Sequence, residues 1–228
     1  MISVLLFYFA LIPNRLKNLI LLFDFFSKRN NHRHGLNQPT IVINRAVTWV
    51  IHLIFKLLDL SGIWEFIDFA SRWIKPNTRF LSRTEIDLLQ SHFGKRSMLL
   101  FVIGIDELSL MAFLGKKYTG KKRLGVTTLR KINFSQRLHL DNLSDQKWLV
   151  HEFVHVLQMQ SIGGIYMLEA LIAQQRLGYD YVLKTESRLK DFNLEQQAEI
   201  VSDIIFDDSS DQIELNRVLL NDALHGRF

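Results

Sequence analysis

The segment that most restricts the fold is Trp148–Gln158, which reads WLVHEFVHVLQ. It is apolar nearly all round, as is typical of a helix buried in a protein core. It nevertheless carries three ionisable residues, His151, Glu152 and His155. At 3.6 residues per turn, the two histidines lie on one face of a helix, one turn apart. Because burial of ionisable groups costs free energy, the sequence predicts that something compensates them at this point.

The pattern His-Glu-x-x-His is rare. With the 8 His and 9 Glu of this chain, about 0.01 occurrences are expected by chance. On a helix, two histidines at this spacing bind zinc, and the intervening glutamate acts as the general base. The alternative is a pair of core histidines whose hydrogen bonds are satisfied within the protein. We identify His151 and His155 as candidate zinc ligands and Glu152 as the candidate catalytic base.

Cysteine is absent from the chain. This excludes a disulfide scaffold, an iron–sulfur or cysteine-zinc site, and a cysteine nucleophile. A bound metal ion must therefore be held by histidines and carboxylates. A catalytic zinc site with two histidines needs a third protein ligand, which has to come from another part of the chain.

Residues 193–205 (NLEQQAEIVSDII) predict a second helix that is rich in carboxylates. Asn193 and Gln196 form a start that is similar to a capping box. The alternative, a solvated charged helix, is disfavoured because apolar residues occupy one side of the segment, namely Ala198, Ile200, Val201, Ile204 and Ile205.

Within this segment, Glu199–Asp203 has the ExxSD form and resembles the gluzincin metallopeptidases, which include thermolysin-like enzymes. The resemblance implies that Glu199 is the third zinc ligand. It also implies that Asp203 accepts a hydrogen bond from a ligand histidine and fixes its tautomer. Glu195 is the alternative third ligand. We prefer Glu199 because it has an aspartate one turn later on the same face.

The resemblance extends over about residues 81–205. This stretch is similar to a group of bacterial metallopeptidase-like domains found near Rhs and contractile-injection (type VI-like) systems. The elements that carry the similarity are LSRTEIDLLQSHFG, WLVHEFVHVLQ, ALIAQQ and NLEQQAEIVSD. It implies an α+β fold, mostly α and zincin-like, in which the HExxH and ExxSD helices accompany a small β-sheet.

Two functions agree with these motifs. The first is a zinc metalloendopeptidase that cleaves a peptide or protein substrate, with Glu152 as general base. The second is a zinc-stabilised interaction or effector module of a secretion or toxin system, with little or no turnover. The intact Glu152 favours the peptidase, because a structural zinc site needs no base. Candidate donors to the reaction's oxyanion are Tyr166, Tyr179, Tyr181 and His225.

Charge divides the chain into two parts. Residues 1–140 hold 21 Lys and Arg against 8 Asp and Glu, whereas residues 141–228 hold 7 against 15. We expect an apolar, aromatic-rich helical region over 1–80 and a zincin-like domain over 81–228. The basic loop at 115–125 has no interleaved aromatic platform, so nucleic acid is not the expected partner.

The first twelve residues, MISVLLFYFALI, are similar to the apolar part of a signal peptide. No basic segment precedes them and no small-residue cleavage site follows, so we predict no cleavable signal. A membrane span is disfavoured because Arg15 and Lys17 would lie in the hydrocarbon. Residues 1–26 remain a candidate for peripheral membrane contact, with a buried helical hairpin or an unpacked extension as the alternatives. The expected location is cytoplasmic, with or without this attachment.

The remaining elements follow from apolar periodicity and capping residues. Ser82 and Glu85 predict a capping box, and Gly94 the end of that helix. We further expect a linker over 27–39, helices over 41–59 and 63–75, a buried strand over 98–105, one or two edge strands within 126–140, and helices from Asp141 onward. The edge strand at 131–140 is the predicted binding edge for an extended substrate.

Overall fold

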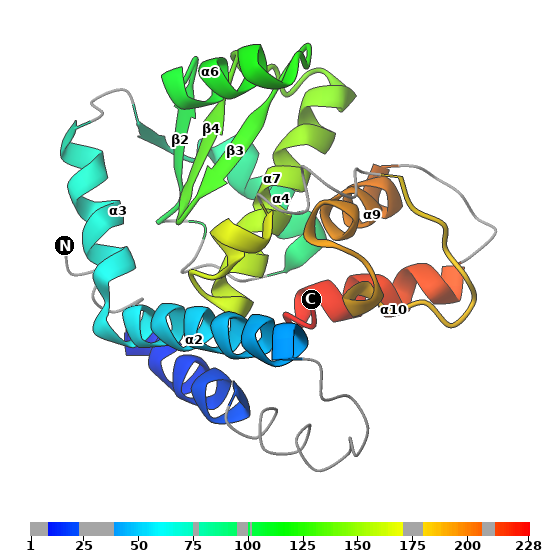
Figure 1. Ribbon diagram of the computed structural model, residues 1–228. Helices are drawn as coiled ribbons and strands as arrows, with labels where there is room; N and C mark the ends of the chain where they lie inside the picture. The colour runs from blue at the N-terminus through cyan, green and yellow to red at the C-terminus, as the bar shows by residue number, and fades with distance from the viewer. Residues whose placement is uncertain are drawn as a thin grey trace.

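The computed structural model describes residues 9–22, 39–74, 78–94, 100, 102–170, 180–206 and 213–228. These residues form an α+β fold that is mostly helical, with one small sheet (Figure 1). The sheet and helix α6 lie at one end of the molecule, and helix α2 lies at the other.

The sheet has four strands in the order β1-β2-β4-β3. Strands β1 (Arg79–Phe80) and β2 (Gly104–Glu107) are antiparallel, β2 and β4 (Lys131–Phe134) are parallel, and β3 (Gly125–Thr128) is antiparallel to β4. Strand β3 is therefore the outer strand on one side, next to helix α7 (Leu143–Ile162). The prediction that residues 131–140 form the binding edge was wrong, because β4 lies between two other strands.

The apolar run 98–105 is not the strand that the sequence predicted. Leu100 is helical, Val102 lies in a turn, and β2 starts only at Gly104. Leu100, Val102 and Ile103 are nevertheless buried in the core. A run of apolar residues predicts that a segment is buried. It does not by itself distinguish a strand from a turn that crosses the core.

The predicted basic loop at 115–125 is also partly wrong. Helix α6 (Leu110–Thr119) continues into it and ends at Gly120, which has a left-handed backbone with φ of 69°. Glycine adopts this conformation without the steric penalty of a side chain, which explains where the helix stops.

Two capped helices were predicted well. In helix α4 (Arg83–Phe93), the Ser82 side chain accepts a hydrogen bond from the Glu85 amide, and the Glu85 carboxylate accepts one from the Ser82 amide. In helix α9 (Leu194–Phe206), the Asn193 side chain accepts from the amides of Glu195 and Gln196. Both caps satisfy amides that have no partner within the helix.

The core surrounds α7. Its apolar side chains pack with the sheet, with α4, with α9 and with helix α10 (Ile213–Leu224). Fully buried members include Leu89, Ile105, Ile132, Phe134, Leu149, Phe153, Leu157, Leu189, Ile200 and Leu219. The 3-10 helix η1 (Leu189–Asp191) precedes α9. Helix α7, which carries the His-Glu-x-x-His motif, is thus the central element of the fold.

The N-terminal region comprises a helix over residues 9–22, called the N-terminal helix below, with α2 (Pro39–Ser61) and α3 (Ile63–Ile74). The predicted linker at 27–39 lies outside the described residues except for Pro39, which begins α2. The predicted helices at 41–59 and 63–75 correspond to α2 and α3. Among the described helices, none has the length and apolar character needed to cross a membrane.

Candidate metal centre

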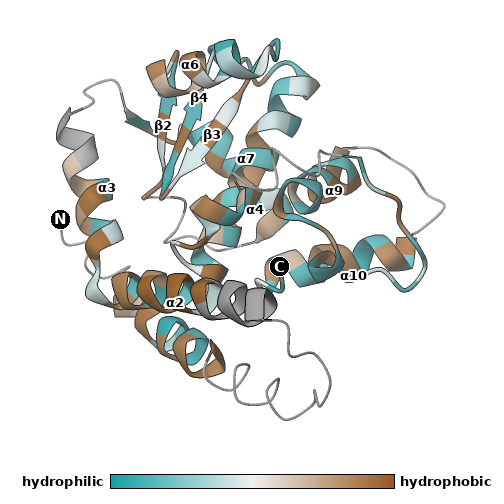
Figure 2. Ribbon diagram, in the orientation of Figure 1, coloured by the Kyte–Doolittle hydropathy of each residue, from teal (hydrophilic) through white to brown (hydrophobic). Residues whose placement is uncertain are grey.

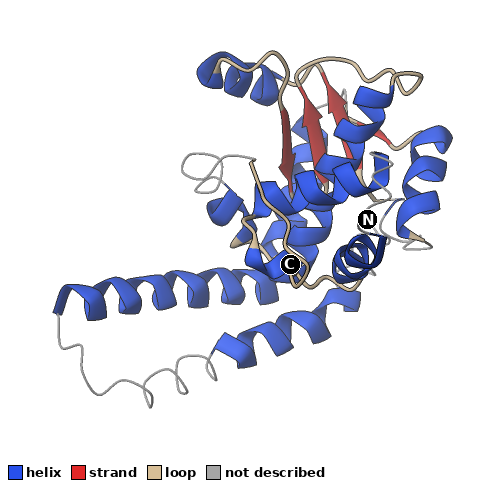
Figure 3. Cartoon of the chain, turned by 90° about the vertical axis from the view of Figure 1, so that its right-hand side faces the viewer, coloured by secondary structure: helices blue, strands red, loops and turns tan. Residues whose placement is uncertain are grey.

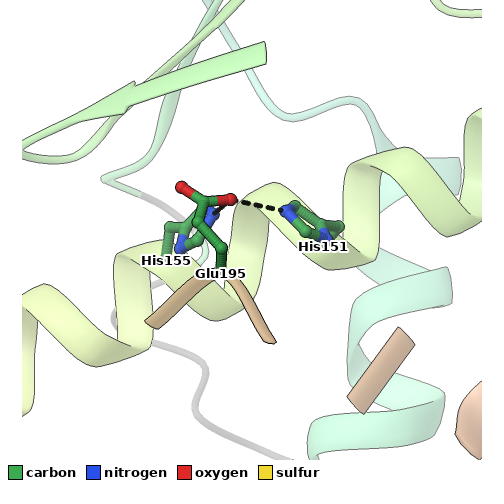
Figure 4. A group of neighbouring side chains, drawn as sticks. All are labelled: His151, His155 and Glu195. Carbon is green, nitrogen blue, oxygen red and sulfur yellow. Dashed lines mark ion pairs between the residues drawn. The ribbon is translucent and has the colours of Figure 1, made fainter. Parts of the chain in front are cut away.

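Helices α7 and α9 bring two histidines and a carboxylate to one point (Figure 4). Nε2 of His151 lies 3.5 Å from Oε2 of Glu195, and Nε2 of His155 lies 3.4 Å from the same oxygen. All three residues are buried. The two imidazole rings are 4.9 Å apart and nearly perpendicular. One turn of α7 and the first turn of α9 therefore supply three convergent donor atoms.

The spacing of these donors fits a metal ion. Ligand atoms arranged tetrahedrally at about 2.1 Å from zinc are about 3.4 Å from one another. The two distances between nitrogen and Glu195 oxygen are close to this value, and all three donor atoms lie within 4.8 Å of one another. Two imidazoles and a carboxylate are also a usual donor set for catalytic zinc. This buried group could hold a metal ion.

The electrostatics of the group also favour a positive charge between the donors. Burial disfavours a charged His151, but Glu195 and Glu199 outweigh burial and raise its pKa to about 10. The pKa of His155 is raised for the same reason, chiefly by Glu195. Burial would raise the pKa of Glu195, but the two histidines hold it well below its usual value. A carboxylate buried this deeply requires a cation, either a proton on each imidazole or a metal ion.

Glu199 lies outside the donor triangle. Its Oε2 is 3.1 Å from Nδ1 of His151, the ring nitrogen that Glu195 does not contact. The hydrogen bond from His151 lowers the pKa of Glu199, so this carboxylate is ionised and accepts the Nδ1 proton. The sequence favoured Glu199 as the third ligand, whereas the geometry favours Glu195. Glu199 instead has the supporting role that the sequence assigned to Asp203.

Asp203 does not contact either histidine. It accepts a hydrogen bond from the Tyr181 hydroxyl and forms an ion pair with Lys147. The carboxylates at 195, 199 and 203 are each one turn apart on α9. Glu195 contacts His155, Glu199 contacts His151 and Asp203 contacts Lys147, so the two helices run in opposite directions along this contact. The sequence interpretation was shifted by one helical turn along this series.

The second histidine is held by a residue that the sequence analysis missed. Gln158 is fully buried, and its Oε1 lies 2.7 Å from Nδ1 of His155. Its amide nitrogen donates to the Leu194 carbonyl and to Oε1 of Gln197, so Oε1 must be the acceptor for His155. This places one proton of His155 on Nδ1 and turns Nε2 toward Glu195, where Nε2 can bind a metal ion or carry the second proton. Gln158 lies three residues after His155, and this spacing was the available signal.

Strand β3 holds the Glu152 side chain in place. The Thr127 hydroxyl donates to its Oε2 at 2.8 Å and to its backbone carbonyl at 3.1 Å. Its carboxylate also packs against Gly125, where a Cβ atom would lie 2.1 Å from Oε1. The strand therefore leaves room for this carboxylate only because residue 125 has no side chain. The roles of Thr127 and Gly125 were not predicted.

The donors and Glu152 line a cleft of about 340 Å³. Strand β3 contributes Gly125–Thr128 to one wall, and Tyr166, Met167 and Ala170 contribute to the lining as well. Among the candidate oxyanion donors, Tyr166 lies in this cleft, with its ring 5.7 Å from that of His155. Tyr181 bonds to Asp203, Nδ1 of His225 bonds to the Asn221 carbonyl, and Tyr179 lies outside the described residues.

No protein-family model, no curated protein and no solved structure matches the chain. The inference of function therefore depends on the geometry of the site and on the motifs.

Proposed function

We propose that this protein is a zinc-dependent peptidase with a zincin-like fold, in which His151, His155 and Glu195 hold the metal ion. The observation that carries the proposal is the convergence of these three donors with the buried Glu152 carboxylate in one cleft. A site that only stabilises a fold is closed by four protein ligands, whereas a catalytic site has three and opens to a cavity. A bound zinc ion would polarise the scissile carbonyl and lower the pKa of the attacking water.

Glu152 is the proposed general base. It is adjacent to His151 in sequence, is not part of the donor triangle, and lines the cleft. It would take a proton from the attacking water and deliver it to the leaving amine. Thr127 and Gly125 fix its position, because one donates to the carboxylate and the other leaves space for it. Such a fixed carboxylate is of use in catalysis and of none in a purely structural site.

The substrate would bind along β3. This strand bonds to β4 on one side, and its residues line the cleft. An extended peptide could pair with its outer backbone groups by strand addition, which would place a peptide bond near Glu152. Tyr166 is the proposed donor to the oxyanion, because it alone of the described candidates lines the cleft.

The deciding experiment compares the full chain with Glu152→Gln. The purified protein should contain about one zinc ion per chain and cleave an unfolded protein substrate. Glu152→Gln should retain the zinc and lose cleavage by roughly 100-fold or more. Glu186→Gln, at an exposed turn, is the matched control and should behave as wild type.

Two results would contradict the proposal in different ways. Equal behaviour of wild type and Glu152→Gln toward a broad peptide library would favour the zinc-stabilised module over the peptidase. A protein without bound zinc, or a His151→Ala variant with unchanged metal content, would refute the metal site itself.

A further inference from the structure

Helix α2 has its polar side turned toward the protein. His52 lies 3.8 Å from Glu169, Lys56 donates to the Ile162 carbonyl, and Asp59 accepts from the Gly164 amide at 2.8 Å. Lys56 and Asp59 are buried. In helices at the surface of soluble proteins the arrangement is the opposite, with the apolar stripe toward the core.

The apolar side of α2 faces outward. Its members are spaced three and four residues apart and each is about half exposed; they are Val47 (52%), Val50 (45%), Ile54 (49%) and Leu57 (51%). Figure 2 shows the apolar colouring along this helix. The stripe is continuous over three turns, which distinguishes it from single apolar residues scattered over an ordinary surface.

The N-terminal helix repeats this inverted arrangement. Arg15 bonds to Glu65 and to the Asp59 carbonyl, and Asn18 donates to the Ser161 carbonyl at 2.8 Å. Leu11 packs on the core, whereas four other large apolar residues of this helix are exposed, namely Phe9, Leu16, Ile20 and Leu21. Figures 1 and 3 show this helix beside α2, at the end of the molecule opposite the sheet.

Helix α3 is the third helix with polar residues turned inward and apolar residues turned outward. Asp68 is buried and pairs with Arg130 at 2.7 Å, whereas Phe66 is 69% exposed and Ile67 is 43% exposed. The outward apolar residues of the N-terminal helix, α2 and α3 together are called the N-terminal apolar surface below. Three adjacent helices that turn buried charges inward and apolar side chains outward are suited to an apolar environment.

The charge of this region specifies the kind of environment. Residues 1–80 hold 10 Lys and Arg and 4 Asp and Glu. Three of the acidic residues, Asp59, Glu65 and Asp68, point inward to the partners described above, and the fourth, Asp24, lies outside the described residues. Of the basic residues, Arg15, Lys56 and Arg79 also pair with groups of the protein, whereas Lys17 is exposed on the N-terminal helix. Basic residues beside an apolar helix face complement the headgroups of anionic lipids.

We propose that the N-terminal apolar surface binds peripherally to a bilayer containing anionic phospholipid, with the N-terminal helix and α2 lying along the interface. This agrees with the finding that none of the described helices could span a membrane. It extends the sequence prediction for residues 1–26 to α2 and α3. The inference is independent of the metal centre.

Helix α6 provides an internal control. It also exposes large apolar residues, including Phe113 (52%) and Leu114 (55%). It lies at the opposite end of the molecule from α2, so a flat bilayer that contacts α2 cannot contact α6 (Figure 1). The control side chains are therefore matched in size and exposure and differ in location.

The absence of cysteine allows a site-specific test with the full chain. Ile54→Cys and Phe113→Cys are each labelled with an environment-sensitive fluorophore and titrated with phosphatidylcholine vesicles, with and without phosphatidylserine. The label at 54 should shift to the blue and saturate when phosphatidylserine is present, and the label at 113 should not shift. Val50→Asp and Leu57→Asp should each weaken vesicle binding about tenfold. Circular dichroism of these variants verifies that they are folded.

Each other outcome overturns the proposal. Absence of binding, an equal response of both labels, or a response at 113 alone would refute the N-terminal apolar surface as the contact. Binding that does not depend on phosphatidylserine would refute the anionic lipid. A shift at 54 that depends on protein concentration without vesicles, with a dimer in light scattering, would assign the surface to a second copy of the chain.

Discussion

The carboxylate of Glu199 contacts Nδ1 of His151 at 3.1 Å, while Nε2 of the same ring points to Glu195 at 3.5 Å. The two carboxylates, one turn apart on α9, therefore have different functions toward one imidazole. Glu195 lies where it could donate to a metal ion. Glu199 orients the ring and retains its proton on Nδ1.

This relationship predicts a difference between two alanine variants. Glu195→Ala should weaken zinc binding by more than about 100-fold, because a donor to the metal is lost. Glu199→Ala should retain zinc with an affinity reduced about 10- to 100-fold, because only the support of His151 is lost. Zinc content after dialysis against a chelator measures both. The reverse order of effects would return the ligand role to Glu199.

The error in the sequence prediction has a physical cause in the helix spacing. Glu195, Glu199 and Asp203 recur at one-turn intervals on the same face of α9. Their spacing predicts which face of α9 meets α7, but not which of the three carboxylates lies opposite His151. That choice is made by the packing of α9 on α7, which depends on side chains distributed over the whole core. The motif on α7 needed no such information, because its two histidines are on one helix.

Gly125 predicts a variant that affects the base and not the metal. In Gly125→Ala the new Cβ would lie 2.1 Å from Oε1 of Glu152, and the flexible end of that side chain would move away. We expect unchanged zinc content and a kcat for peptide cleavage lowered about 100-fold. Gly104→Ala is the control. Its new Cβ would lie 2.7 Å from a Thr78 methyl group, at a position away from the cleft. Equal loss of activity in both variants would indicate general destabilisation.

Gln158 connects the metal centre to the start of α9. Gln158→Leu would leave His155 Nδ1, the Leu194 carbonyl and Oε1 of Gln197 without this buried partner. We expect zinc affinity to fall about 10- to 100-fold and the free energy of unfolding to fall by about 2 kcal/mol. Gln158→Glu keeps an acceptor for His155 but no donor for Leu194. Compared with Gln158→Leu, it should therefore regain more of the zinc affinity than of the stability. If both were regained, or neither, the two hydrogen bonds of Gln158 would not have these separate effects.

Asp68 and Arg130 join α3 to the turn between β3 and β4. Their side chains are 1% and 6% exposed, with 2.7 Å between them. Asp68→Ala would leave a buried guanidinium without this carboxylate, at a cost of about 3–5 kcal/mol in the free energy of unfolding by urea. Glu214→Ala breaks the exposed pair with Arg217 and should leave stability unchanged. If the two variants were equally stable, α3 would not be an integral part of the fold.

The sequence predicted local features better than contacts between distant segments. The Ser82–Glu85 capping box depends on four consecutive residues, and its prediction is confirmed. The inward polar side of α2 could not be predicted, because the partners of Lys56 and Asp59 are more than 100 residues later in the chain. The position of β4 inside the sheet likewise depends on its pairing with β2, which a local pattern does not contain.

Glu85 predicts a dependence of stability on pH. Burial favours its neutral form, but two hydrogen bonds from Arg79 at 2.8 Å and one from the Ser82 amide outweigh burial and hold the pKa of Glu85 below its usual 4.5. A group whose pKa is lowered by folding stabilises the protein above its unfolded pKa, and this contribution is lost as the pH falls through the folded pKa.

Glu85→Gln keeps the cap but loses the charge that pairs with the partly exposed Arg79. At neutral pH we expect the variant to be less stable than wild type by about 1 kcal/mol. The difference should shrink as the pH falls below about 4.5, because Glu85 then takes up a proton in the unfolded state, and it should vanish once the pH is below the pKa of Glu85 in the folded protein. Urea unfolding of both proteins at several pH values measures this gap. Asp87→Asn, an exposed position on the same helix, should show little change at any pH. A gap that stays constant or widens in acid would show that the Glu85 charge does not stabilise the fold.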